Sequence, residues 1–125
     1  MGKNGVLMFA HGARDPRWAA PFEQIVARVR TARPEQPVRV AFLELMQPDI
    51  RTAAAELVHD GCTRIDVLPL FLGAGGHVRK DLPPLLEQLR GTHEGVEFTL
   101  HPAVGEAPAL IAAIADIALD LSLPP

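Results

Sequence analysis

Two histidines have the residue type and the surroundings needed for metal and proton chemistry. His11 ends the apolar run Val6–Ala10, and His77 follows the apolar run Pro69–Leu72 across a glycine-rich segment. Imidazole nitrogen binds divalent transition metals, and it exchanges protons near neutral pH. If the two runs are neighbouring strands, the histidines can hold one divalent metal and leave positions open for a substrate. For His11 alone, the alternative is a structural histidine bonded to a nearby carbonyl.

The segment before His77 contains three glycines in the four residues 73–76. Glycine tolerates positive φ and lets backbone N–H groups approach a ligand without a Cβ in the way. At the start of a helix such donors favour negative charge, so a carboxylate-rich or phosphorylated ligand would suit them. A flexible connection to a helix is the competing interpretation, because one glycine-rich turn is a weak signal.

The elements that position these residues alternate along the chain. The patterns predict strands over 5–10, 38–44, 62–72 and 95–101, and helices over 16–33, 49–59, 77–90 and 108–121. Pro83-Pro84 is expected to bend or delay the third helix. Four successive strand-helix units predict an α/β fold: a parallel sheet of about four strands, with helices on both faces. Residues 1–125 are expected to form a single domain.

Ligands of parallel α/β sheets bind at the carboxyl ends of the strands. His11, Glu44, the loop 73–77 and His101 all fall at such ends, so they should share one edge of the molecule. Glu44 is a candidate third ligand or proton acceptor, with a solvated rim carboxylate as the alternative. Arginines next to the two histidines, Arg14 among them, are candidates to bind carboxylates, with a solvated surface as the alternative.

Composition excludes several function classes. The formal net charge is -3, and the 5% of aromatic residues includes no tyrosine, which argues against a nucleic-acid-binding surface. The apolar stretch before His11 is too short for a membrane span or a signal sequence. Cys62 is the only cysteine, which excludes an intrachain disulfide and favours the reducing cytoplasm.

Three motifs together resemble a known family, the class II chelatases of the short CbiX type, which insert a metal into sirohydrochlorin. The motifs are HGARDP from His11, FLE with QPD between Phe42 and Asp49, and PLFL through HV to DLP between Pro69 and Pro83. The third motif is the most specific, because this order of residues would rarely occur by chance. The resemblance covers nearly the whole chain; one departure is Ala13, where relatives usually have serine.

The resemblance implies a chelatase-like fold and roles for individual residues. His11 would be a metal ligand and proton acceptor, and His77 the second metal ligand. Glu44 would assist in proton transfer, and the substrate would contact Arg14, Gln47, Leu72, Gly73, Ala74, Gly75 and Gly76. The substrates would be sirohydrochlorin, or a related tetrapyrrole, and Co²⁺, Fe²⁺ or Ni²⁺, with no further cofactor. Because larger chelatases resemble two such lobes, a homodimer is also implied.

Two other functions remain open on the residues alone. A non-catalytic metal carrier or sensor would use the same two histidines, but it leaves the motif between Pro69 and Pro83 without a role. A phosphate-binding module would use the glycine segment, but the chain lacks the glycine spacing of dinucleotide-binding and P-loop motifs. Cobalt is the first expectation for the metal, and cobalamin, sirohaem and nickel-tetrapyrrole pathways all stay open.

Overall fold

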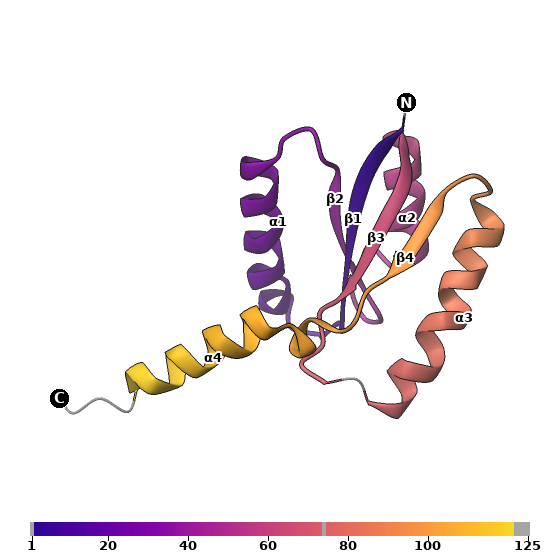
Figure 1. The fold of residues 1–125 in the computed structure, drawn as a ribbon. Helices are drawn as coiled ribbons and strands as arrows, with labels where there is room; N and C mark the ends of the chain where they lie inside the picture. Colours follow the sequence, from indigo (N-terminus) through magenta and orange to yellow (C-terminus); the bar gives the residue numbers. More distant parts are fainter. Residues whose placement is uncertain (1, 74, 122–125) are drawn as a thin grey trace.

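Four parallel strands form one sheet in the computed structural model, which describes residues 2–73 and 75–121 (Figure 1). The strands are β1 (Lys3–Ala10), β2 (Val38–Phe42), β3 (Cys62–Pro69) and β4 (Glu97–Leu100), in the spatial order β2-β1-β3-β4. β1 pairs with both β2 and β3, which explains its apolar sequence: a central strand covered on both faces needs no polar side. The predicted parallel α/β sheet is confirmed.

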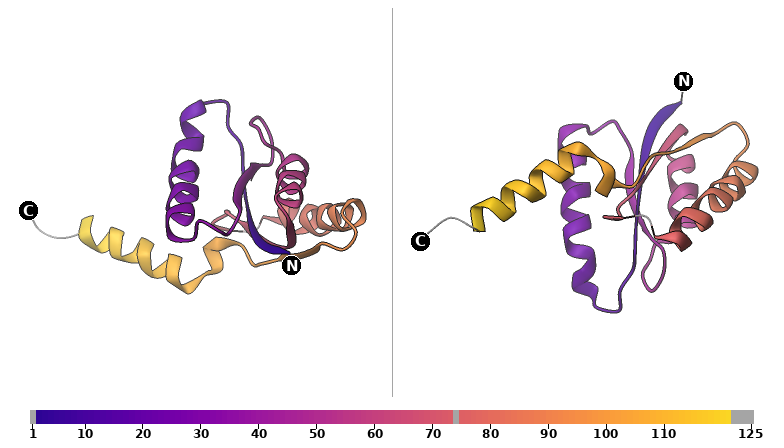
Figure 2. Two further views of the ribbon diagram at one scale, coloured as in Figure 1. Left: turned by 90° about the horizontal axis from the view of Figure 1, so that it is seen from above. Right: turned by 60° about the horizontal axis from the view of Figure 1, so that its bottom comes forward.

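Helices cover both faces of this sheet, as predicted. α1 (Ala20–Ala32) lies on one side, and α2 (Ile50–His59) and α3 (Gly76–Thr92) lie on the other (Figure 2, left). A short 3-10 helix, η1 (Pro16–Ala19), leads into α1. Within the described ranges, no helix is long and apolar enough to cross a membrane.

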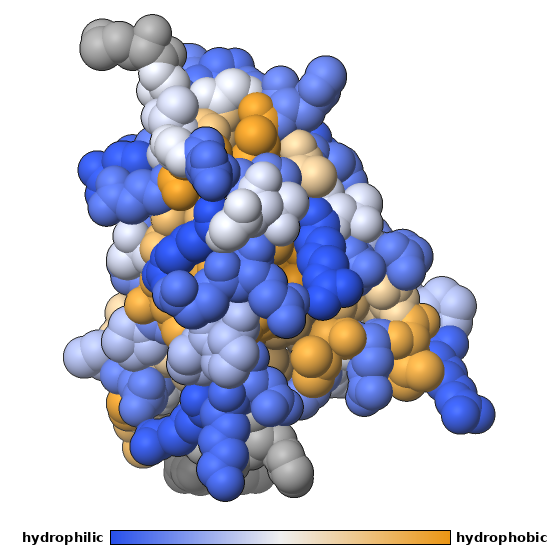
Figure 3. Space-filling model, turned by 90° about the vertical axis from the view of Figure 1, so that its right-hand side faces the viewer, coloured by the Kyte–Doolittle hydropathy of each residue, from blue (hydrophilic) through white to orange (hydrophobic). Residues whose placement is uncertain are grey.

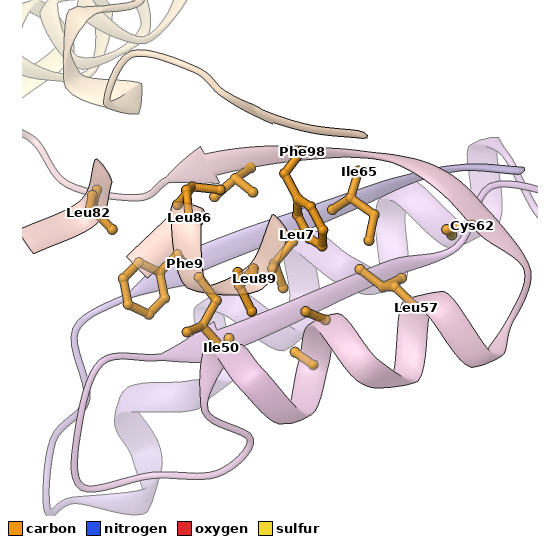
Figure 4. Packing of buried hydrophobic residues seen from close by; sticks show 14 of the residues in the cluster. Leu7, Phe9, Ile50, Leu57, Cys62, Ile65, Leu82, Leu86, Leu89 and Phe98 are labelled. Carbon is orange, nitrogen blue, oxygen red and sulfur yellow. The ribbon is translucent and has the colours of Figure 1, made fainter. Parts of the chain in front are cut away.

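The larger core lies between the sheet and the α2–α3 pair (Figure 4). Alternate residues of the strands supply it, so Leu7 and Phe9 of β1 meet Leu57 of α2 and Leu86 of α3. Each such side chain, when fully buried, stabilises the fold by about 1.5–3 kcal/mol. The opposite face has a smaller core under α1, formed by Met8, Val26 and Val38 with partly buried neighbours.

Pro83 and Pro84 lie inside α3 and do not delay it, because the helix already begins at Gly76. A proline removes one backbone hydrogen bond and leaves the carbonyl four residues earlier without its donor. Here those carbonyls belong to Arg79 and Lys80, which are exposed like the prolines themselves. Water can therefore satisfy them. Figure 3 shows this side of the molecule, and it is mostly hydrophilic.

Three strands are shorter than their patterns predict, at the edge where ligands are expected. β2 ends at Phe42, so Glu44 stands in the following loop and not at the end of a strand. β3 ends at Pro69 and not at residue 72, and β4 at Leu100. The apolar residues that suggested longer strands belong partly to loops that carry exposed leucines.

The last helix, α4 (Pro108–Leu121), follows a short 3-10 helix, η2 (Val104–Glu106), and has the predicted bounds. It does not lie on the sheet but extends away from the body on the side of α1 (Figures 1 and 2). None of its residues is buried.

Asp49 caps the N-terminus of α2, because its carboxylate accepts a hydrogen bond of 2.8 Å from the Thr52 N–H. We expect Asp49→Ala to lower the free energy of unfolding by about 1 kcal/mol, while Asp49→Asn retains most of the cap. Urea unfolding at neutral pH measures both variants. Unchanged stability in both variants would show that the cap contributes nothing.

The same hydrogen bond holds the pKa of Asp49 below its ordinary value of 3.8. A carboxyl with a lowered folded-state pKa stabilises the fold above its ordinary pKa, and this contribution is lost as pH falls through the folded-state value. The difference in free energy of unfolding between the wild type and Asp49→Ala should therefore be constant at neutral pH and disappear only in acid.

Candidate active site

The carboxyl ends of the four strands meet at one edge, as predicted, and backbone hydrogen bonds join the segments that follow them. The Leu43 N–H donates to the carbonyl of Ala10 at 2.8 Å, and the Leu70 N–H to that of Phe9 at 2.7 Å. The His101 N–H donates to the carbonyl of Val67 at 2.9 Å. The segments that follow β2, β3 and β4 are thus each held by the neighbouring strand.

His11 is the first residue after β1, and it is exposed at this edge. Its ring lies against the buried ring of Phe71, with 4.5 Å between centroids and 55° between planes. Its carbonyl accepts a hydrogen bond of 2.8 Å from the indole N–H of Trp18. The imidazole is therefore supported by an apolar ring on one side and accessible on the other. This arrangement suits a side chain that must bind a metal ion and then release it.

Gly12 brings the loops after β1 and β2 into direct contact. A Cβ at this position would lie 1.5 Å from the carbonyl oxygen of Glu44, which no side chain can tolerate. The backbone of Glu44 therefore lies beside the residue that follows His11, and the Glu44 side chain is exposed. A glycine is required here by close approach and not by an unusual φ.

The loop after β2 turns sharply before α2. Leu45 adopts a φ of 66°, which is uncommon for a residue other than glycine, and the Gln47–Pro48 peptide bond is cis. The Phe42 N–H donates to the carbonyl of Pro48 at 2.9 Å, which closes the loop. Gln47 lines a cavity of about 570 Å³ with Val26 of α1, Val40 of β2 and Thr52 of α2, so it faces the outer edge of β2.

The glycine-rich segment connects β3 to α3, and His77 is the second residue of that helix. Gly75 is the N-cap residue, with a φ of −64°. Gly75 therefore stands at the helix start without a positive φ; the positive-φ glycines of the described residues are Gly61 and Gly95. A Cβ at Gly73 or Gly75 would meet no atom within 4 Å, so these positions leave open space at the site.

Ala74 and the side chains of residues 76–78 lie outside the described residues, the His77 ring among them. Among the side chains that the structure does describe, no three His, Cys, Asp or Glu residues lie together as a metal site. The pairing of the His77 and His11 rings thus stays a prediction, as does a third ligand from Glu44.

The loop before the glycines is supported from the other end of the chain. The Gly105 N–H of η2 donates to the carbonyl of Phe71 at 3.0 Å. A Cβ at Gly105 would lie 1.7 Å from the carbonyl oxygen of Leu72, so η2 packs directly on this loop. Leu72 itself is 71% exposed.

Exposed apolar side chains lie at the same strand-end edge as His11, and most of them were not predicted. Leu43 and Leu45 follow β2, Leu72 follows β3, and Trp18 lies in η1 beside the ring of Phe22. Leucines within turn segments, where polar residues are the norm, are the sequence signal that would have found them. Together they offer an apolar rim of the kind that a large flat ligand can cover.

Charged residues lie at the same edge. Arg14 is exposed in the segment after His11. Nearby, the Arg17 guanidinium donates to the carboxylate of Asp15 and holds the pKa of that carboxyl below its ordinary value. Arg14 is thus available to an external carboxylate, whereas Arg17 is engaged within the chain.

The other histidines have different surroundings. The His101 ring is 2.8 Å from the carboxylate of Asp66, a pairing that the sequence analysis missed. The signal for it was an acidic residue at the centre of the apolar strand β3. His59 lies at the carboxyl end of α2, near the opposite edge of the sheet, and His93 contacts the ring of Phe98. Cys62 is buried, and burial raises the pKa of its thiol.

Comparisons with known proteins identify the family of the chain. The family model CbiX matches residues 5–120. A protein from Methanococcoides burtonii named sirohydrochlorin cobaltochelatase is 31% identical over 74% of this chain and 71% of its own. One of the same name from Sulfurisphaera tokodaii is 34% identical over 70% and 71%.

Solved structures show the same fold. A CbiX protein from Marinobacter aquaeolei has a TM-score of 0.82 and 32% identity, covering 94% of this chain and 95% of its own. SirB from Bacillus subtilis with Fe³⁺ has a TM-score of 0.81 at 23% identity. The match to SirB covers 98% of this chain but only 48% of SirB, so this chain spans about half of that protein. The family match and the two curated relatives show that the chain belongs to the CbiX family.

Proposed function

We propose that this chain is a sirohydrochlorin chelatase, a lyase-type enzyme that inserts a divalent metal into the macrocycle and releases two protons. The observation that carries the proposal is His11: an exposed imidazole at the end of β1, supported by Phe71, at the same strand-end edge as several exposed leucines. The relatives named sirohydrochlorin cobaltochelatase support the choice of substrate.

In the proposed reaction, His11 and His77 hold the incoming metal through neutral imidazole nitrogen. Two neutral ligands bind a divalent ion loosely enough for transfer to the four nitrogens of the macrocycle. Each pyrrole N–H that the metal replaces releases a proton, and His11 accepts it once its nitrogen has left the metal. Glu44, which stands in the neighbouring loop, takes protons onward to solvent.

The substrate would lie over the strand-end edge. Its apolar ring would cover the exposed leucines, Leu72 among them, and the open space at Gly73 and Gly75 would leave room for it. Its carboxylates would meet Arg14 and the backbone N–H groups at the start of α3, where the helix dipole favours negative charge. Gln47 faces the outer edge of β2 in this structure, so a contact from Gln47 would require the loop after β2 to move.

For the metal we propose Co²⁺, with Fe²⁺ and Ni²⁺ as the alternatives. The names of the relatives favour cobalt, while SirB from Bacillus subtilis has been solved both with Fe³⁺ and in complex with cobalt. Imidazole accepts all three ions, so the ligand set does not select among them. The pathway served would be cobalamin or sirohaem biosynthesis in the cytoplasm, with no nucleic-acid or membrane partner.

We further propose that the enzyme works as a homodimer. The chain spans about half of SirB. A two-fold pairing would bring two strand-end edges together around one macrocycle. A monomer that kept full activity on dilution would contradict this part of the proposal.

Sirohydrochlorin mixed with the protein and with Co²⁺, Fe²⁺ or Ni²⁺ tests the function directly. We expect a protein-dependent shift to the absorption spectrum of the metallated product, faster than the same mixture without protein, and lost in the variant with both His11→Ala and His77→Ala. Tight metal binding without faster insertion would instead establish the carrier function.

A further inference from the structure

A cavity that the proposed reaction does not yet use lies at the strand-end edge, between the first turns of α3 and the segment that follows β4. Its volume is about 320 Å³, at the lower limit of small-molecule sites, so it can hold part of a large ligand but not a whole macrocycle. Pro69 and Leu100, the last residues of β3 and β4, line it together with Leu82 of α3 and Pro102. These residues are apolar, so the cavity suits a short aliphatic group.

Arg79 brings a positive charge to this cavity. It stands three residues before Leu82, and Leu82, Leu86 and Leu89 form the buried face of α3 (Figure 4). Because residues three apart share a face of a helix, Arg79 continues this face toward the strand-end edge, where it is exposed. Among the described residues, no side chain forms an ion pair with its guanidinium. An open guanidinium of this kind binds carboxylates, often through two parallel hydrogen bonds.

Two further titratable residues line the cavity. The His101 ring is held by the Asp66 carboxylate at 2.8 Å. Glu106 of η2 is exposed, and no ion pair joins it to Arg79. A carboxylate that entered the cavity would be attracted by Arg79 and repelled by Glu106. The two residues should therefore change the affinity for such a ligand in opposite directions.

The cavity borders the surface proposed for the macrocycle. Phe71, which supports the His11 ring, belongs to the same buried cluster as Leu82. Gly105 of η2, beside the cavity, packs on the carbonyl of Leu72. β1 and β4 are separated by two strand spacings of about 4.8 Å, so the ends of these strands lie about 10 Å apart across the sheet. A macrocycle centred over His11 would therefore bring its rim, and not its centre, to the cavity.

We propose that this cavity binds one carboxylate-bearing arm of the macrocycle, with Arg79 holding the carboxylate and the apolar residues contacting the methylene groups. The inference rests on the substrate of the proposed function and adds a substrate-binding residue to that site. The contact is with the rim of the macrocycle, away from the reacting nitrogens. Arg79 should therefore stabilise the bound substrate and the transition state equally.

Binding of metal-free sirohydrochlorin tests Arg79 without any chemistry. Trp18 is the only tryptophan, and its indole donates to the His11 carbonyl at the same edge, so quenching of its fluorescence measures the Kd. Arg79→Gln removes the guanidinium and keeps a good helix-forming residue. We expect this variant to raise the Kd roughly 10–100-fold, the effect of losing a hydrogen bond between charged groups.

Lys80→Gln is the matched control. Lys80 is the next residue of α3, it is also exposed, and it does not line the cavity. The control removes the same charge from the chain, and it should leave the Kd within about twofold of the wild type. Glu106→Gln removes the opposing charge from the cavity and should lower the Kd roughly 2–5-fold. Opposite effects at two exposed positions would not arise from a loss of folding.

Initial rates of metal insertion give the second measurement. Arg79→Gln should raise the KM for sirohydrochlorin and leave kcat unchanged, since a contact made equally in both states affects binding only. An unchanged Kd in Arg79→Gln would overturn the inference and leave the proposed function standing. A higher Kd in Glu106→Gln would show that the cavity prefers a cation, which would overturn the inference as well. A wild type that binds sirohydrochlorin through Arg79 but inserts no metal would overturn the proposed function alone.

Discussion

His11→Ala is expected to lower the rate of metal insertion by about 10²–10⁴-fold, the range by which a positioned acid-base group accelerates proton transfer. The variant loses both a metal ligand and the proton acceptor, so the effect should appear at saturating metal and sirohydrochlorin. The measurement is the initial rate of the absorption change on metallation. Because the His11 side chain is exposed, the thermal unfolding midpoint should change little.

His59→Ala is the matched control, since His59 is also an exposed histidine but lies at the carboxyl end of α2. It should insert metal at the wild-type rate. A His11→Ala enzyme that retained more than about a tenth of the wild-type rate would remove His11 from the chemistry, because a lost acid-base catalyst costs more than that. His77→Ala, assayed in parallel, would then show whether one histidine suffices.

The sheet was predictable from the sequence because its signals are local. The apolar run that ends at His11, and Asp49 ahead of a helical pattern, each report on the residues around them. The order of strands and helices then restricts the topology, since parallel strands need crossover helices. For the same reason, His11 and the loop before His77 could be assigned to one edge of the sheet from the sequence alone.

The contacts between loops were not predictable, because they depend on residues distant in sequence. Phe71 follows β3 and supports the His11 ring from another strand. Asp66 and His101 are 35 positions apart, and only the pairing of β3 with β4 brings them together. The loop after β2 was assigned partly to the strand because Leu43 continues the apolar run, while the turn at Leu45 depends on a positive φ that its sequence does not signal.

The position of α4 was not predictable for a different reason. Its helical pattern is clear, and Ile111, Ile114 and Ile117 share one face opposite the two aspartates of the helix, but that face does not lie on its own sheet (Figure 2). Where a helix has one apolar face, as α2 has with Ala53 and Leu57, the sequence also says which side is buried. An apolar face indicates burial without indicating which surface covers it, so the position of α4 has to come from the structure.

Gly12→Ala is expected to lower the free energy of unfolding by about 1–3 kcal/mol, the cost of overpacking a fitted contact. The new Cβ would lie 1.5 Å from the carbonyl oxygen of Glu44. That oxygen belongs to the backbone, so it cannot move aside as the end of a flexible side chain would. The loops after β1 and β2 must separate, which displaces His11 and Glu44 together. We therefore expect metal insertion to fall even at temperatures where the variant is fully folded.

Gly91→Ala is the matched control, because it makes the same chemical change in the same chain. Gly91 lies within α3, and a Cβ there would meet no atom within 4 Å. Alanine at such a helical position should raise stability by about 0.5–1 kcal/mol, since it restricts the unfolded chain more than glycine does. In urea unfolding, the free energy of unfolding should thus fall in Gly12→Ala and rise in Gly91→Ala. Metal insertion should be impaired only in Gly12→Ala. If Gly12→Ala were as stable and as active as the wild type, the loops after β1 and β2 would not be in contact, and Glu44 would lose its place beside His11.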